Sequence, residues 1–202
     1  MKKPTLLNFH IQPKGIISQI CLQQGLLYLE DVMEHLKNLP YGRTSEKRSL
    51  GLVLTEGRGT CSAKHALIAQ LAHENGLRDL RLALCTYNMS DILHEEVGAV
   101  LRHYNLKAIP EARCFLKYHG AIYNLCGRKH PIQPEIVSEI EIAPLQIGTF
   151  KKRYHRNYIE SWLQIEKLNK CWSPDQIWSI REECIEAAEE NWESRARLLC
   201  CA

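Results

Sequence analysis

The sequence lacks the features that direct a chain into or across a membrane. Residues 1–8 include two lysines but no apolar run long enough for a secretory signal peptide. No stretch approaches the ~20 consecutive apolar residues of a membrane span. We therefore expect a cytoplasmic protein with no membrane partner.

A large charge imbalance is also missing. The net charge of +3 over 202 residues is too small to favour nucleic acid as a partner. One basic run, residues 151–156 (KKRYHR), interleaves cations with a tyrosine and a histidine. This run leaves a nucleic-acid-associated function open as an alternative, beside the simpler interpretation of a solvated helix start.

The third absence is a Cys-x-x-Cys pair, although the chain has nine cysteines. Cys114, His119 and Cys126 have the residue types of metal ligands, but their spacing fits no common zinc pattern. We therefore predict no metal site and no cofactor. Without an export signal, we expect reduced thiols rather than disulfides.

What the sequence does contain is a glycine-rich turn that leads into a helix, residues 57–65 (GRGTCSAKH). Thr60 is predicted to cap a buried helix that runs from Cys61 to about Asn75, and Gly76 to end it. This places Cys61 in the first turn, where the partial positive charge of the helix end lowers the pKa of a thiol. The N–H groups there can also hold an oxyanion. The pattern predicts a cysteine nucleophile.

The remaining periodicities predict an α+β fold in one domain, residues 1–202. The domain has a helical part at 1–78, a sheet-rich part at 79–128 and a helical C-terminal part at 150–202. Hydrophobic spacing and turn residues predict helices at 16–38 and 91–104, strands at 80–87, 113–118 and 121–126, and a helix that begins at Ser173-Pro174. His119-Gly120 is predicted to form a two-residue hairpin turn between the last two strands.

Five segments resemble bacterial proteins of the transglutaminase-like superfamily. They are residues 39–43 (LPYGR), 59–67 (GTCSAKHAL), 74–77 (ENGL), 109–112 (IPEA) and 177–185 (IWSIREECI). The resemblance implies a papain-like fold: N-terminal helices, a nucleophile helix packed on a small antiparallel sheet, and C-terminal helices. It also implies a Cys–His–Asp triad in which Cys61 is the nucleophile.

The other two triad positions depart from the family's pattern. Arg113 stands where the resemblance implies His, and Asn124 where it implies Asp. With His119-Gly120 as the turn, Arg113 faces Cys126, and Asn124 is its diagonal neighbour within ~7–8 Å. A four-residue turn would instead set Arg113 opposite Asn124. In both registers the two residues share a face of the sheet and form a site pair.

Arg113 can favour the thiolate of Cys61 but cannot protonate a leaving amine, because it does not exchange a proton near neutral pH. We therefore expect weak or absent activity towards amides and a role as a binding or regulatory module with an acyl, peptide or protein partner. Two histidines leave an active acyl transferase or hydrolase open as an alternative. His119 lies at the turn, six residues beyond Arg113, and His65 lies four residues after Cys61. Their simpler interpretations are an exposed turn residue and a hydrogen-bonded core residue.

Overall fold

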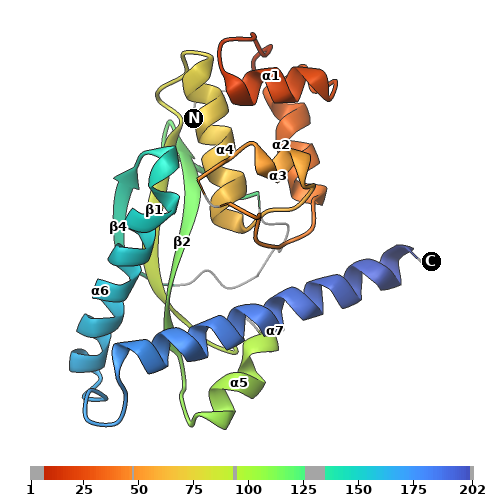
Figure 1. Ribbon diagram of the computed structural model, residues 1–202. Helices are drawn as coiled ribbons and strands as arrows, with labels where there is room; N and C mark the ends of the chain where they lie inside the picture. The colour runs from red at the N-terminus through yellow and green to blue at the C-terminus, as the bar shows by residue number, and fades with distance from the viewer. Residues whose placement is uncertain (1–6, 47, 93–94, 126–134, 201–202) are drawn as a thin grey trace. The chain divides into compact units, whose positions relative to one another are not determined.

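The computed structural model describes residues 7–46, 48–92, 95–125 and 135–200, with side chains of the last helix described as far as residue 188. The fold is α+β, as predicted (Figure 1). The strands are β1 (Arg81–Met89), β2 (Ile109–Tyr118), β3 (Ala121–Tyr123) and β4 (Ile136–Ile142), in the sheet order β3-β2-β1-β4. The α-helices are α1 (Ile16–Gln23), α2 (Leu29–Asn38), α3 (Leu52–Thr55), α4 (Cys61–Glu74), α5 (Gly98–His103), α6 (Thr149–Ile165) and α7 (Pro174–Cys200), and the 3-10 helices are η1 (Glu95–Val97) and η2 (Pro144–Ile147). Among the described residues, no helix is both long and apolar enough to cross a bilayer.

The chain forms two compact units. Unit 1 comprises residues 1–84, 113–128 and 140–148, and unit 2 comprises residues 85–112, 129–139 and 149–202. Strands β1, β2 and β4 each have residues in both units. The expectation of one domain over 1–202 stays a prediction.

In unit 1, helix α4 packs against α1, α2, α3 and η2 (Figure 1). Its side chains from Ala66 to Ala69 are fully buried, which confirms a buried helix. One prediction for this unit is wrong: residues 16–38 form two helices rather than one. The break falls at Gly25, which has φ 75°, a left-handed conformation that glycine adopts without steric cost.

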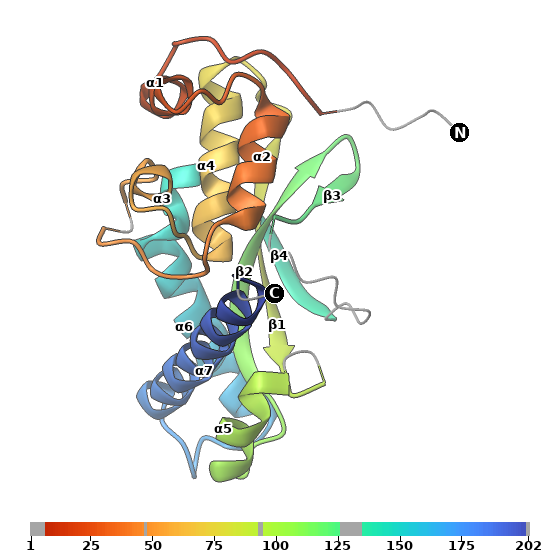
Figure 2. The same cartoon turned by 90° about the vertical axis from the view of Figure 1, so that its right-hand side faces the viewer.

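The β2–β3 hairpin of unit 1 has the predicted turn (Figure 2). Tyr118 pairs with Ala121, and the turn residues His119 and Gly120 have φ values of 48° and 80°. Two positive φ values are typical of the turns that suit the twist of a hairpin. Strand β2 begins at Ile109, four residues before the predicted start, and β3 ends at residue 123.

In unit 2, helices α5, α6 and α7 enclose a core that includes Leu101, Ile159 and Ile180. Helix α7 begins as predicted with a reciprocal cap. The Ser173 N–H donates to Gln176 Oε1 at 2.8 Å, and the Gln176 N–H donates to Ser173 Oγ at 3.2 Å. The predicted helix at 91–104 is shorter in the structure, with η1 and α5 covering 95–103; residues 93 and 94 lie outside the described residues.

Candidate functional site

The turn before α4 holds Cys61 at the first position of a capped helix. The Gly59 N–H donates to the Pro40 carbonyl at 3.1 Å. A Cβ atom at Gly59 would lie 2.9 Å from a valine side chain, so this close approach requires glycine. The Thr60 Oγ1 accepts a hydrogen bond from the Ala63 N–H at 3.3 Å. The predicted cap is confirmed, and Cys61 begins the helix as expected.

Cys61 itself is half-buried and disulfide-bonded. Its partner is not among the cysteines that the structure describes as free, which are Cys21, Cys85, Cys114, Cys171 and Cys184. The expectation of reduced thiols is therefore wrong for Cys61. Pairing depends on two Cα atoms lying within about 7 Å, which spacing along the sequence does not reveal. A sulfur in a disulfide is not a thiolate, so Cys61 can act as a nucleophile only after reduction.

His65 lies one helical turn after Cys61, and both of its ring nitrogens are occupied. The Leu125 N–H donates to Nε2 at 2.9 Å. Because a backbone N–H can only donate, Nε2 is the acceptor and Nδ1 carries the proton. The Nδ1–H then donates to the Cys61 carbonyl at 2.6 Å.

The environment of His65 also keeps its imidazole neutral. The side chain is 1% exposed, and burial lowers its pKa to about 4, with the positive charges of Arg113 and Lys64 adding to the effect. A neutral ring with its lone pair already accepting a hydrogen bond has no site for a proton from a thiol. His65 therefore ties α4 to the segment after β3, which matches its simpler interpretation as a core residue.

Arg113 lies on β2 in the same unit and is half-buried, with its Nε atom buried. Burial of His65 is the largest cause of its lowered pKa, and the positive charge of Arg113 is a further cause. The guanidinium therefore lies within electrostatic reach of that imidazole. The structure thus brings Arg113, His65 and the first turn of α4 into one neighbourhood. Position 113 is not turned away into solvent.

Asn124 directly follows β3, and its side chain is exposed. The register pairs Leu116 with Tyr123, and one further step along it sets Asn124 opposite Phe115. Because side chains alternate between the two faces of a strand, this extended register would put Asn124 on the face of Arg113; the site pair stays a prediction. The expected position of Arg113 opposite Cys126 falls outside the described residues.

The structure places His119 at the exposed tip of the hairpin, with its ring 4.2 Å from that of Tyr118. Six residues of extended strand, or roughly 20 Å, separate it from position 113. The ring contact with Tyr118 supports its interpretation as a turn residue.

Lys64 is a site residue that sequence reasoning missed. It is 4% exposed, and its Nζ donates to the Leu39 carbonyl at 2.6 Å. Burial lowers its pKa to about 8. With the bond between Gly59 and Pro40, this contact fixes residues 39–40 against the start of α4. These two segments, LPYGR and GTCSAKHAL, are among those on which the expected resemblance rests. Their occurrence together is the sequence signal that could have pointed to this contact.

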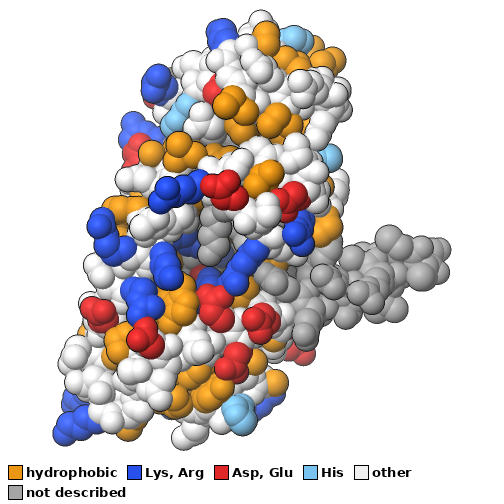
Figure 3. All heavy atoms as spheres, in the orientation of Figure 1, with side chains coloured by type: hydrophobic (Ala, Val, Ile, Leu, Met, Phe, Trp, Pro, Cys, Tyr) orange, Lys and Arg blue, Asp and Glu red, His pale blue; other side chains and the backbone are white. Residues whose placement is uncertain are grey.

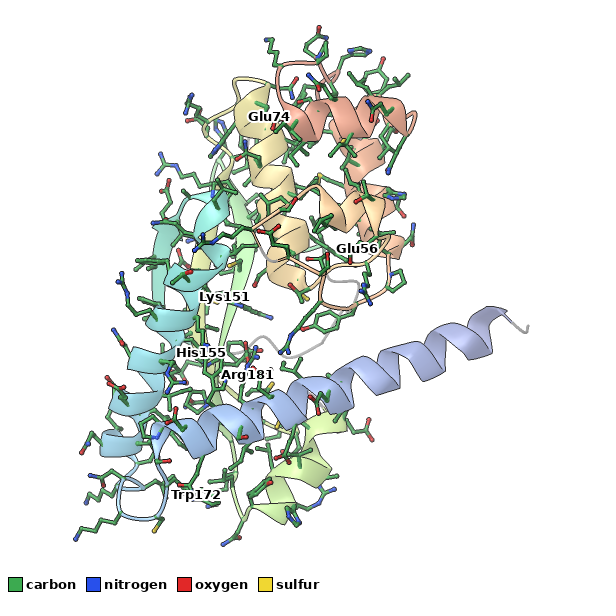
Figure 4. All side chains as sticks on the ribbon, in the orientation of Figure 1. Glu56, Glu74, Lys151, His155, Trp172 and Arg181 are labelled. Atoms are coloured by element: carbon green, nitrogen blue, oxygen red, sulfur yellow. The ribbon has the colours of Figure 1, made fainter. Side chains whose placement is uncertain are left out.

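A third resembling segment, residues 74–77, serves α1 rather than the cysteine. The Glu74 carboxylate (labelled in Figure 4) accepts from the Ile17 N–H at 3.2 Å and from the Ser18 N–H and Oγ at 2.8 and 2.7 Å. These contacts satisfy N–H groups at the start of α1. Asn75 adds a hydrogen bond from Nδ2 to Ser18 Oγ at 3.1 Å. The segment is therefore a structural joint between α4 and α1.

Within the described part of the chain, no group of three His, Cys, Asp or Glu side chains is arranged to hold a metal ion. Comparison with protein-family models, with curated proteins and with solved structures finds no match for this chain.

Proposed function

We propose that this chain is a transglutaminase-like protein that keeps the nucleophile helix of the family but has lost its acid–base chemistry, and that it acts as a binding or regulatory module. Three features of unit 1 support this. Cys61 stands at the first position of a capped helix, Arg113 lies on the neighbouring hairpin, and a glycine turn is pinned to residues 39–40.

The chemistry of amide transfer requires a group that takes a proton from the thiol and gives one to the leaving amine. Arg113 cannot do this because its guanidinium stays protonated. Its charge can favour an anionic sulfur or an oxyanion in a bound ligand. Positioned acid–base catalysis contributes ~10²–10⁴ in rate. Loss of the base therefore removes turnover, while the groups that bind a ligand stay in place.

One observation carries the proposal: the imidazole of His65 is neutral, buried and hydrogen-bonded at both nitrogens. It is the histidine nearest to Cys61 in the sequence, and it cannot serve as the base without breaking its bond to Leu125. The partner that fits a binding or regulatory module is an acyl, peptide or protein group held at the start of α4. Because Cys61 is disulfide-bonded, its thiol is available only under reducing conditions.

A labelling experiment tests the proposal. The protein is reduced, treated at neutral pH with a thiol-reactive acylating probe and followed by mass spectrometry. Cys171 is exposed and free, so the experiment uses a Cys171→Ala background, with Cys61→Ala as the matched control. We expect acylation of Cys61 after reduction, no acylation before it, and no measurable deacylation. Repeated turnover at Cys61 would contradict the proposal and indicate an active acyl transferase or hydrolase.

A further inference from the structure

Helices α6 and α7 of unit 2 place three cations against a single aromatic ring. The Nζ of Lys152 lies 5.5 Å from the centroid of Trp178, and the Cζ atoms of Arg156 and Arg181 each lie 5.6 Å from it. Cation–π attraction holds charges at such distances. Since all three surround one centroid, they lie within about 11 Å of one another.

Three carboxylates lie beside these three cations, and they pair with Arg181 and Arg156 only. Arg181 is held by a buried bidentate pair with Glu111, at 2.6 and 2.9 Å, and by Glu182 at 2.9 Å. Arg156 pairs with Asp175, whose side chain is 82% exposed. Among the described residues, no carboxylate lies within ion-pair distance of Lys152, nor of its neighbours 151 and 153.

Two further titratable residues of α6, His155 and Lys151, add no negative charge. His155 is 1% exposed, lies 5.2 Å from the Trp178 ring, and donates from Nε2 to the Pro110 carbonyl at 2.9 Å. Lys151 lies close enough to Glu111 and His155 to influence the pKa of both. Figure 4 labels Lys151, His155 and Arg181, and Figure 3 shows Lys and Arg side chains gathered over the first half of α6.

We propose that Lys152 and Arg156 beside Trp178, the three residues here called the Trp178 cluster, bind a phosphate group. Phosphate oxygens accept several charge-assisted hydrogen bonds at once, and guanidinium groups match their geometry. The exposed carboxylate of Asp175 is the group that a phosphate would displace from Arg156, because surface ion pairs contribute little. The indole ring holds the cations in place before binding, which lowers the ordering cost.

The aromatic rings of this region favour phosphate over nucleobases as the group that is bound. The Trp178 ring already makes cation–π contacts with three cations. The ring of Phe150 stacks on that of Tyr154 at 6.3 Å and lies 5.6 Å from the Cζ of Arg153. Bases need exposed ring faces for stacking, whereas phosphate needs only the cations. The phosphate is either free or part of a nucleic acid backbone, and the test separates these two sources.

The test is isothermal titration of the full chain with inorganic phosphate and, separately, with a mixed-sequence single-stranded oligonucleotide. The cluster variant is Lys152→Ala with Arg156→Ala. The matched control is Lys107→Ala with Lys170→Ala, which removes two exposed cations elsewhere in unit 2. Circular dichroism checks folding, and Lys152→Ala alone, at an exposed position, gives the same direction if the double variant does not fold.

We expect the cluster variant to bind at least about tenfold more weakly than the wild type, a loss of about 1.4 kcal/mol, and the control to bind like the wild type. Binding of inorganic phosphate identifies a free phosphate site. Binding of the oligonucleotide alone, with a salt slope that falls by about 1.4 in the cluster variant, identifies a nucleic acid backbone. The proposal is overturned if neither ligand binds below about 10 mM, or if the control loses as much affinity as the cluster variant.

Discussion

The backbone N–H of Leu125 donates to Nε2 of His65 at 2.9 Å, across 60 residues of sequence. This bond uses the lone pair that a general base would need. Because Nδ1–H donates to the Cys61 carbonyl, the tautomer is fixed as well. The imidazole next to the cysteine is thus a structural tie within unit 1.

Replacement of His65 should destabilise the fold. His65→Ala removes two hydrogen bonds, leaves the Leu125 N–H without its acceptor and opens a cavity. We expect a loss of about 2–4 kcal/mol in the free energy of unfolding, measured with urea. The matched control is His119→Ala at the exposed turn, for which we expect a change below about 0.5 kcal/mol. Equal effects of the two substitutions would show that the His65 contacts contribute nothing.

Stability should also depend on pH through His65. Its pKa in the folded chain is lowered to about 4 from an ordinary 6.5, so between these values the unfolded chain binds more protons. Stability therefore falls as the pH is lowered from about 6.5 to about 4, by up to about 3 kcal/mol. In His65→Gln this dependence should shrink. Part of it should remain, because burial also lowers the pKa of His155. Identical pH profiles for wild type and variant would contradict the assignment.

The buried ion pair of Glu111 and Arg181 predicts a second stability effect. Their side chains are 7% and 11% exposed. Burial acts to raise the pKa of Glu111, but the charges of Arg181 and His155 and the hydrogen bonds from Arg181 together lower it to about 2. Glu111→Gln leaves the guanidinium buried without its bidentate partner, so we expect a loss of about 3–5 kcal/mol by urea unfolding. Glu141→Gln breaks an exposed pair with Arg81 and should change stability little. A small loss at Glu111 would show that water or another carboxylate compensates.

The elements that sequence reasoning predicted well have local causes. The start of α4 follows from a Thr60 cap and its end from a glycine with φ 88° at Gly76. The start of α7 follows from the reciprocal cap of Ser173 and Gln176. The hairpin turn follows from the tolerance of His119 and Gly120 for positive φ. In each case a few adjacent residues carry the information.

Features that depend on distant residues could not be predicted in the same way. The role of His65 requires Leu125, and the cation cluster requires Trp178 on one helix to meet a basic run on another. The extension of β2 to Ile109 depends on its neighbours in the sheet rather than on its own alternation, since the strand is buried along residues 109–112. The disulfide at Cys61 has no signature in cysteine spacing.

The most direct test of the central claim is amine release from a peptide amide by the reduced protein in the Cys171→Ala background. We expect no release from the wild type. Arg113→His with Asn124→Asp should restore a base and its orienting carboxylate and make amine release measurable, since positioned acid–base catalysis contributes about 10²–10⁴ in rate, and this release should be lost when Cys61→Ala is added. Amide turnover by the reduced wild type, or a folded double variant with no gain, would contradict the account.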